Sequence, residues 1–533
     1  MITALHHHVE QQARIRPEAA ALTSSDTTLT YEQLWRAVRQ AGAQLAGLGV
    51  ERHDRVAVYL EKRFETVAAL WGTSVAGGVF VPVNPLLKGK QVAHVVRDSG
   101  ARILVTSPGR LAAVRDQLDG TGLTAVLLVD QPDGGTTPEG LPGVAVHRWA
   151  PGTEDHLADV ATLPQAPRPG TDADIAAILY TSGSTGAPKG VVLSHRNLLV
   201  GATSVSGYLH NTADDVLLAV LPLSFDAGLS QLTTAFAVGA HVVLLDYLRP
   251  RGVAVACERH GVTGITGVPP LWTQLATVDW PPRALRTLRY FANTGGHMPA
   301  TLLRELRDLF PAAAPYLMYG LTEAFRSTYL DPEQVDLRPD SIGRAIPNAE
   351  ILVLRPDGTP CAADEPGELV HRGSLVALGY WNDPERTAAR FRPVPGYDEP
   401  WRAAPEAAVW SGDTVVRDAE GYLYFVGRAD EMIKTSGYRV SPTEVEDAAL
   451  GTGLVREAVA LGMPDDRLGQ RIVLVVAAPE TVDTDRLLKE MRQSLPTFML
   501  PAEVRPADSL PRNPNGKLDR SGIRAQVTAE ASA

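Results

Sequence analysis

Residues 180–190 read YTSGSTGAPKG, a loop of glycines and hydroxyl side chains with one lysine. The apolar runs 175–180 and 191–193 predict buried strands on either side of it. Glycines let backbone N–H groups approach an anion closely, and the hydroxyls and the ammonium add further donors. The stretch therefore indicates a phosphate-binding loop on a stiff two-strand base. The candidate ligands are Thr181, Ser182, Gly183, Ser184, Thr185, Gly186 and Lys189.

The loop is not a Walker A motif. That motif needs Gly-Lys followed by Ser or Thr at the start of a helix, whereas here Pro188 precedes Lys189 and Gly190 follows it. P-loop kinases and ATPases are therefore disfavoured. Taken alone, the stretch also fits a flexible Ser/Gly surface loop, so its meaning depends on the rest of the chain.

Size, charge and cysteine content limit the classes of protein. With 533 residues, 44% of them hydrophobic, the chain can form several packed cores and more than one domain. The formal net charge of −11, without a block of like charge, argues against nucleic acid or an anionic membrane as the main partner. The cysteines, Cys257 and Cys361, fit neither a disulfide framework nor a metal site, and the N-terminus lacks the apolar core of an export signal. We expect a cytoplasmic protein without a membrane span.

Strand-like and helix-like patterns alternate along the first part of the chain, which is typical of an α/β fold. The helical pattern 64–76 lies among the strand-like runs 55–60, 79–83 and 103–105. A glycine-bearing turn near residues 428–430 leads into a small α+β module. We therefore predict a large N-terminal domain of α/β subdomains, residues 1–429, and a small C-terminal α+β domain, residues 430–533.

Further motifs follow the loop in a fixed order. They are YGLTE at 319–323, GEL at 367–369, GYW at 379–381, SGD at 411–413, GRAD at 427–430, KTSGYR at 434–439 and NGK at 515–517. Together with the loop, this ordered set resembles the adenylate-forming enzymes, which include acyl-CoA synthetases, firefly luciferases and the adenylation domains of nonribosomal peptide synthetases. The resemblance spans nearly the whole chain and is closest to acyl-CoA ligase-like members. It implies ATP, Mg²⁺ and either CoA or phosphopantetheine as reaction partners.

The resemblance implies catalytic roles for three residues. Attack of a carboxylate on the α-phosphate of ATP builds charge that cations and donors must stabilise. Lys517 corresponds to the lysine that supplies this charge, and Asn515-Gly516 before it predicts a hairpin that presents it at a loop tip. Glu323 corresponds to the ligand of the Mg²⁺ that bridges phosphate oxygens, and Thr322 to a donor to the α-phosphate.

The same resemblance implies the nucleotide site. Tyr319 corresponds to the residue that stacks on adenine, and Asp413 to the carboxylate that accepts both ribose hydroxyls. Arg428 corresponds to a cation beside the ribose and the phosphates. The nucleotide-binding candidates beyond the phosphate loop are Gly295, Gly296, Tyr319, Gly320, Thr322, Asp413 and Arg428.

A mobile C-terminal domain is also implied. Asp430 corresponds to the hinge about which this domain rotates between an adenylating and a thioester-forming pose. Lys517 would face the active site in the first pose, and the segment from Lys434 to Tyr438 in the second. Gly437 would then leave room for a pantetheine arm.

Substrate choice depends on the run LPLSFDAG at 221–228. Phe225 is expected to line the acid pocket. Amino-acid-activating members of the family carry Phe-Asp here, and the aspartate pairs with the α-ammonium of the substrate. By this resemblance, Asp226 indicates an amine-bearing acid. Against this, Gly228 replaces the usual serine, and residues 434–444 look more like acyl-CoA ligases. A helix N-cap is the alternative role for Asp226. By resemblance, the other pocket candidates are Val268, Asn293 and Thr294.

The sequence therefore predicts an AMP-forming acid–thiol ligase, which converts a small carboxylic acid to acyl-AMP and PPi and then to a thioester with CoA. The first alternative is a stand-alone amino-acid or amino-aryl-acid adenylating enzyme that loads an acyl or peptidyl carrier protein. A minor alternative activates nitrite for diazotisation of a substrate amine. A nucleotide-binding regulator without catalysis is disfavoured, because both Lys517 and Glu323 are present.

Overall fold

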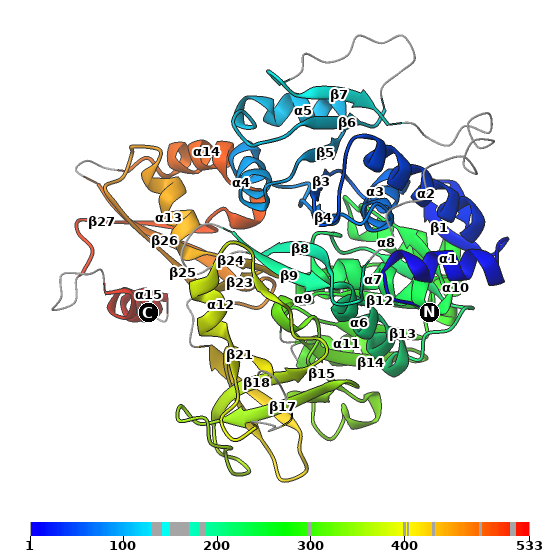
Figure 1. Ribbon diagram of the computed structural model, residues 1–533. Coiled ribbons are helices and arrows are strands. Elements are labelled where there is room, and N and C mark those ends of the chain that lie inside the picture. The colour runs from blue at the N-terminus through cyan, green and yellow to red at the C-terminus, as the bar shows by residue number, and fades with distance from the viewer. Residues whose placement is uncertain are drawn as a thin grey trace.

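A computed structural model describes most of the chain. The described residues are 2–130, 141–149, 170–181, 188–296, 298, 300–397, 401, 405–428, 432–478, 482–511 and 519–531. Within them the strands form three sheets of fourteen, eight and five members, with helices between and around the sheets (Figure 1). The predicted α/β class is confirmed.

The eight-stranded sheet carries the phosphate loop. Its strands are β3 (Arg55–Tyr59), β4 (Val79–Pro82), β5 (Ile103–Thr106), β6 (Ala125–Leu128), β7 (Ala145–Arg148), β8 (Ile175–Thr181), β9 (Lys189–Ser194) and β19 (Gly379–Tyr380). Their order is β19-β9-β8-β4-β3-β5-β6-β7. Within this order, the neighbouring strands in the run β8-β4-β3-β5-β6-β7 are all parallel. β8 and β9 form an antiparallel pair, as the sequence predicts. The associated helices are α2 (Tyr31–Gly47), α3 (Phe64–Val75), α4 (Gly89–Ser99) and α5 (Pro108–Val114).

The fourteen-stranded sheet carries the remaining N-terminal site residues. Its strands are β1 (Ala20–Ser24), β2 (Thr27–Thr30), β10 (Val216–Ala219), β11 (His241–Leu244), β12 (Gly264–Gly267), β13 (Tyr290–Asn293), β14 (Ala314–Tyr319), β15 (Thr328–Leu330), β16 (Ser341–Ala345), β17 (Ala349–Leu354), β18 (Gly367–Gly373), β20 (Phe391–Pro393), β21 (Ala407–Arg417) and β22 (Leu423–Arg428). The run β14-β13-β12-β10-β11-β1 is parallel, and the strands beyond β14 are antiparallel. The helices of this part are α1 (His6–Ile15), α6 (His195–Tyr208), α7 (Asp226–Val238), α8 (Pro250–His260), α9 (Pro269–Ala276), α10 (Pro282–Thr287), α11 (Ala300–Leu309) and α12 (Pro384–Arg390).

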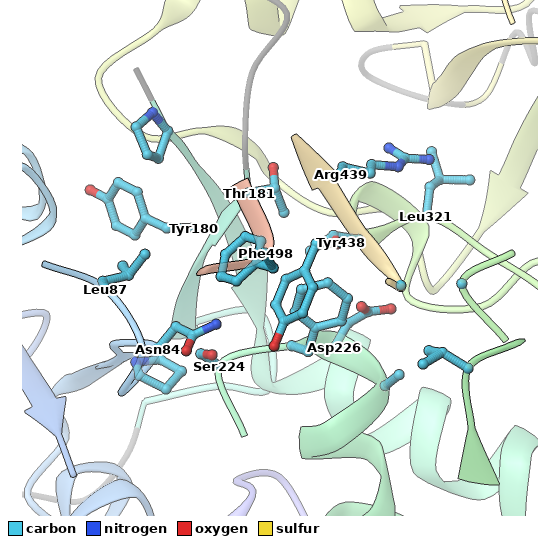
Figure 2. A pocket seen from close by; sticks show the side chains of 18 of the residues that line it. Asn84, Leu87, Tyr180, Thr181, Ser224, Asp226, Leu321, Tyr438, Arg439 and Phe498 are labelled. Atoms are coloured by element: carbon cyan, nitrogen blue, oxygen red, sulfur yellow. The ribbon is translucent and has the colours of Figure 1, made fainter. Parts of the chain in front are cut away.

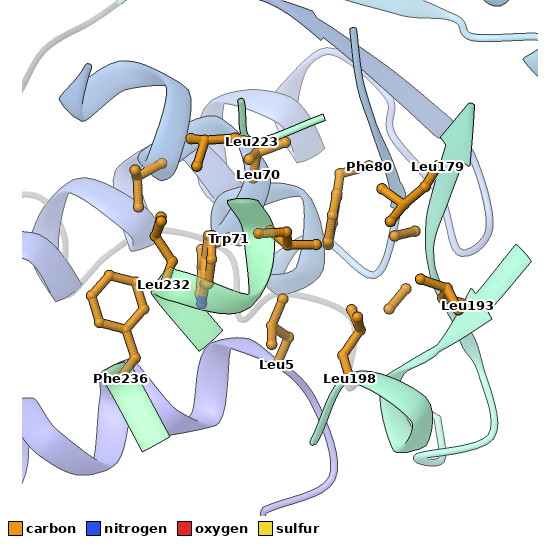
Figure 3. Packing of buried hydrophobic residues seen from close by; sticks show 14 of the residues in the cluster. Leu5, Leu70, Trp71, Phe80, Leu179, Leu193, Leu198, Leu223, Leu232 and Phe236 are labelled. Carbon is orange, nitrogen blue, oxygen red and sulfur yellow. The ribbon is translucent and has the colours of Figure 1, made fainter. Parts of the chain in front are cut away.

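The main hydrophobic core lies between the two large sheets. Helix α3 is buried along almost its whole length, because its sequence is apolar on every face. Figure 3 shows Trp71 of α3 among Leu70, Leu232 and Phe236, and the rings of Trp71 and Phe236 meet edge to face at 5.2 Å. This packing fixes α7, whose first residue is Asp226, relative to the phosphate-loop sheet.

The C-terminal residues form a module with its own core. It contains β23 (Ile433–Thr435), β24 (Tyr438–Val440), α13 (Pro442–Leu450), β25 (Glu457–Asp465), β26 (Gly469–Ala477), α14 (Thr484–Ser494), β27 (Glu503–Ala507) and α15 (Arg520–Ala531). Its apolar clusters draw only on residues from 433 to 527, so a separate C-terminal domain is confirmed. The exact boundary at 429/430 stays a prediction, because residues 429–431 lie outside the described ranges.

The hairpin predicted around Asn515-Gly516 stays a prediction as well, because these residues lie outside the described ranges. The described chain resumes at Asp519 and enters α15 at Arg520. No helix in the described ranges is long and apolar enough to cross a bilayer.

Candidate active site

The phosphate loop lies between the ends of β8 and β9. Thr181 and Lys189 are opposite each other in this strand pair, so the loop begins and ends at one point. The loop candidates Ser182, Gly183, Ser184, Thr185 and Gly186 lie outside the described residues. The Oγ1 atom of Thr181 is buried and has no hydrogen-bond partner among the described residues, which leaves it available to a ligand.

Lys189 and Glu323 meet across 134 residues of sequence. The Lys189 ammonium lies 3.0 Å from Oε1 of Glu323 and donates to the Tyr380 hydroxyl at 2.7 Å. That hydroxyl in turn donates to the same Glu323 oxygen at 2.7 Å. Glu323 comes from the 3₁₀ turn η3 (Thr322–Ala324) directly after β14, and it is 1% exposed. The three side chains form a closed polar cluster beside the phosphate loop.

The Glu323 carboxylate fits a divalent cation. Burial alone disfavours its charged form, but the charges of Lys189, Arg439 and Arg390 outweigh burial and hold the pKa of Glu323 well below its ordinary value. Its Oε2 atom is buried without a partner in the described residues. No cluster of three or more His, Cys, Asp or Glu side chains suited to a metal occurs in the described ranges. A Mg²⁺ held by Glu323 would therefore need phosphate oxygens as further ligands.

Two of the predicted nucleotide residues meet near the carboxyl end of β14. The Tyr319 hydroxyl donates to Oδ2 of Asp413, whose side chain is buried. Arg428 is the strand neighbour of Asp413 in the β21–β22 pair. A carboxylate has two oxygens with several acceptor positions, so Asp413 can accept from Tyr319 and from further hydroxyl donors.

The acid-pocket candidates line a cavity of about 110 Å³. Phe225, Asp226, Val268 and Thr294 contribute to its wall, as do Gly295, Gly320, Thr322 and Gly437. Asn293 does not line the cavity, because its amide turns away to donate to the Gly296 carbonyl at 2.9 Å. The structure thus brings together most, but not all, of the predicted pocket residues.

Asp226 is not a helix N-cap. Phe225 holds the N-cap position of α7, and no side chain caps this helix end by a hydrogen bond. The Asp226 carboxylate instead accepts from Nη1 of Arg326 at 2.7 Å, and the two side chains are 11% and 2% exposed. A buried carboxylate favours a full cation over the partial charge of a helix end.

The C-terminal module faces this cavity with Gly437 and with Tyr438 and Arg439 of β24. The ring of Tyr438 lies edge to face against Phe225 at 5.4 Å and stacks on Phe498 at 3.8 Å. Figure 2 shows Tyr438 and Phe498 together above Asp226. Elsewhere in the wall of the same cavity, Gln91 of α4 donates to Oε1 of Glu444 at 2.7 Å. These contacts hold the module against the pocket.

Gly437 brings the backbone of the module close to the N-terminal part. Its φ is +81°, and a Cβ added there would lie 2.9 Å from both Cγ atoms of Val268. Its carbonyl oxygen lies 3.8 Å from the position of a Cβ on Gly295. Lys434 points elsewhere, with its ammonium 5.0 Å from the ring centre of Phe425. Asp430 and Lys517 lie outside the described residues.

Two residues of this site were not singled out from the sequence. Tyr380 falls within the GYW motif, but its role beside Glu323 becomes visible only when β19 pairs with β9. Arg326 lies three residues after Glu323, and no sequence signal pairs it with Asp226. A positive charge three residues after a conspicuous motif is the one signal that could have drawn attention to it.

Comparisons with known proteins identify the family of the chain. The AMP-binding enzyme family matches residues 9–381, and the AMP-binding enzyme C-terminal domain matches residues 444–517. Feruloyl-CoA synthase from Amycolatopsis sp is 30% identical over 96% of this chain and 97% of its own length. A dimodular nonribosomal peptide synthase from Bacillus subtilis (strain 168) is 30% identical over 98% of this chain, which spans only 21% of that much longer protein.

A solved structure supports the fold over the whole length. A double mutant of o-succinylbenzoate CoA synthetase from Bacillus subtilis, bound with a product analogue, superposes with a TM-score of 0.80 and 26% identity. The match covers 97% of each chain. Since the family match extends over most of the sequence and a ligase relative aligns over nearly its full length, this chain belongs to the AMP-binding enzyme family and is an AMP-forming ligase.

Proposed function

We propose that this ligase activates a small carboxylic acid with ATP and transfers the acyl group to the thiol of CoA. In the first step a carboxylate oxygen bonds to the α-phosphorus and the bond to PPi breaks, which gives acyl-AMP. In the second step the thiolate attacks the acyl carbon and AMP leaves with the bonding electron pair. The thiol proton passes to solvent or to AMP.

The observation that carries this proposal is the meeting of two cavities at Gly437. A second cavity of about 500 Å³ adjoins the acid pocket, and both are lined by Phe225, Val268, Gly437 and Tyr438. A linear arm that entered through the larger cavity would reach the acid beside Gly437, where the backbone lacks a side chain. A cavity of this size has room for far more than a single bound water, which needs about 10–15 Å³, so a linear arm can enter it.

The remaining residues support the adenylation step. Thr322 lines the acid pocket, and Glu323 beside it carries a free carboxylate oxygen for Mg²⁺, which would offset phosphate charge. Asp413 would accept the ribose hydroxyls, and Lys189 would bind phosphate through its ammonium. Lys517 would act in a different pose, since the pose described here places Gly437 against the pocket.

The test separates the two half-reactions. PPi release is measured with ATP, Mg²⁺ and a panel of fatty, aryl, amino and dicarboxylic acids, and thioester formation is measured with CoA in the same wells. We expect one class of acid to stimulate PPi release and CoA to convert its acyl-AMP to a thioester. If PPi is released but no thioester forms with either CoA or pantetheine, the proposed acceptor is wrong.

A carrier protein is the second candidate acceptor, and one observation favours it. Leu86 and Leu248 line the larger cavity and are 53% and 99% exposed. Exposed leucines at the mouth of a cavity suit contact with a protein surface. If the acceptor is a carrier, Leu248→Asp is expected to slow loading of a carrier-bound thiol and to leave the reaction with free pantetheine unchanged.

A further inference from the structure

A buried guanidinium lies in the wall of the acid pocket. Arg326 is 2% exposed and lines the cavity together with Asp226. Its Nη1 atom donates to Oδ2 of Asp226 and to the Phe325 carbonyl, each at 2.7 Å. Its Nε atom is buried and has no partner within the described residues. A buried N–H without an acceptor is costly, so this donor points to a group that the protein itself does not supply.

The backbone before Arg326 is strained. Phe325 has φ 59° and ψ −62°, and the Arg326 N–H donates to the Ala324 carbonyl at 2.6 Å, which closes a three-residue turn. A bulky residue rarely takes this conformation, and such turns persist where the surrounding structure holds them. Here the buried Phe325 ring packs against Gly201, where a Cβ would come within 2.5 Å of it. The fold thus keeps a strained turn that places Arg326 in the pocket wall.

Charge balance restricts which charged groups an acid can bring to this wall. Asp226 and Arg326 neutralise each other, and burial makes any additional unbalanced charge expensive. An acid with an amine alone would bring an extra positive charge to the pair, and an acid with a second carboxylate alone would bring an extra negative one. An acid with both groups adds no net charge, and it gives Asp226 a donor and Arg326 an acceptor.

Resting on the adenylation function proposed above, we infer that the substrate is a small amino-dicarboxylic acid. Its ammonium binds Asp226, its second carboxylate binds Arg326, and the remaining carboxylate is adenylated. The cavity of about 110 Å³ has room for a small acid of this kind.

The experiment uses four acids that differ only in these groups: propanoate, L-alanine, succinate and L-aspartate. ATP–PPi exchange is measured for the wild-type chain with each acid at equal concentration. We expect aspartate to stimulate exchange at least tenfold more than each of the other three. Preference for propanoate would overturn the inference while leaving the adenylation function in place. If none of these four acids stimulates exchange but a fatty or aryl acid does, the inferred substrate class is also wrong, and the adenylation function is again retained.

Single and double variants distinguish recognition from a structural role. Arg326→Met is expected to move the preference from aspartate to alanine, because an unpaired Asp226 then matches an ammonium alone. Asp226→Asn is expected to move it to succinate, because Arg326 then matches a carboxylate alone. A double variant with both changes should prefer propanoate, and it removes the unpaired charge that could prevent either single variant from folding.

The reciprocal shift is the deciding result. A purely structural pair would lower exchange with all four acids by the same factor in both single variants and would show no crossed preference. That outcome would overturn the inference. Thermal unfolding of each variant, together with fluorescence titration by AMP, checks that the fold and the nucleotide site are retained.

Discussion

Replacing Gly437 by alanine tests the proposed thiol route most directly. The new Cβ would lie 2.9 Å from both Cγ atoms of Val268, closer than such atoms pack in folded proteins. Two costs follow. The positive φ of +81° disfavours alanine by about 1–2 kcal/mol, and the overlap with Val268 adds roughly 1–3 kcal/mol because one of the two parts must move.

Gly453 provides a matched control in the same module. Its φ is +71°, and a Cβ added there meets no atom within 4 Å. Gly453→Ala therefore carries the backbone cost without the overlap. The difference between the two variants isolates the contact with Val268, and an overlap of this size corresponds to roughly a 5- to 150-fold change in a rate.

The assay follows each half-reaction separately. ATP–PPi exchange reports adenylation, and single turnover of purified acyl-AMP with CoA reports thioester formation. We expect Gly437→Ala to slow only thioester formation, and Gly453→Ala to change neither rate by more than about twofold. The double variant Gly437→Ala/Val268→Ala should regain part of the lost rate of thioester formation, when its rate is compared with that of Val268→Ala alone. Equal loss in both half-reactions, or the same loss at Gly453, would refute the reasoning.

Lys517→Ala is expected to reduce PPi exchange by at least about a hundredfold and to leave thioester formation from supplied acyl-AMP nearly unchanged, since the lysine would act in one pose only. Loss of both half-reactions would contradict that assignment. Glu323→Gln should raise the Mg²⁺ concentration needed for half-maximal PPi release, and an unchanged Mg²⁺ titration would exclude this carboxylate as a ligand. Burial lowers the pKa of His8 and of His195 to about 4. Between the ordinary pKa of histidine and pH 4, the unfolded chain therefore binds protons that the folded chain does not. As the pH is lowered through this window, the free energy of unfolding should fall by about 1.4 kcal/mol per pH unit for each histidine. Urea unfolding at pH 7 and pH 5 checks this, and equal stability at both would refute it.

The elements around the site follow largely from local sequence pattern. The run 175–180 forms β8, and the pattern 64–76 forms α3, because continuous apolar residues suit elements buried on both sides. Among the motif residues, Tyr319 contacts Asp413, and Gly437 lines the cavity. Some of these motif residues sit at a strand end or a turn, as Tyr319 does at the end of β14 and Gly437 does between β23 and β24, and there backbone geometry restricts the residue type.

The partners within the site could not be predicted in the same way. Asp226 and Arg326 are 100 residues apart, and they meet only because α7 and the turn after β14 pack against the same core. The turn itself depends on Phe325 taking a backbone conformation that its own side chain disfavours. Local propensity therefore pointed to a helix cap for Asp226, and tertiary packing gave it a cation instead.

Gly228 bears on a conflict between two sequence signals. Asp226 indicates an amine-bearing acid, whereas Gly228 and residues 434–444 look more like acyl-CoA ligases. A Cβ on Gly228 would lie 1.9 Å from the Pro222 carbonyl oxygen, so the tight turn before α7 excludes serine at this position. Its departure from the Phe-Asp-x-Ser pattern thus reflects backbone packing and carries no information about a substrate amine. Residues 437–439 and Glu444 belong to the C-terminal module, and they line the same cavity as Asp226 of α7. Because Asp226 and the segment 434–444 come from different domains, the two signals are independent, and an amine-bearing acid is compatible with the proposed CoA acceptor.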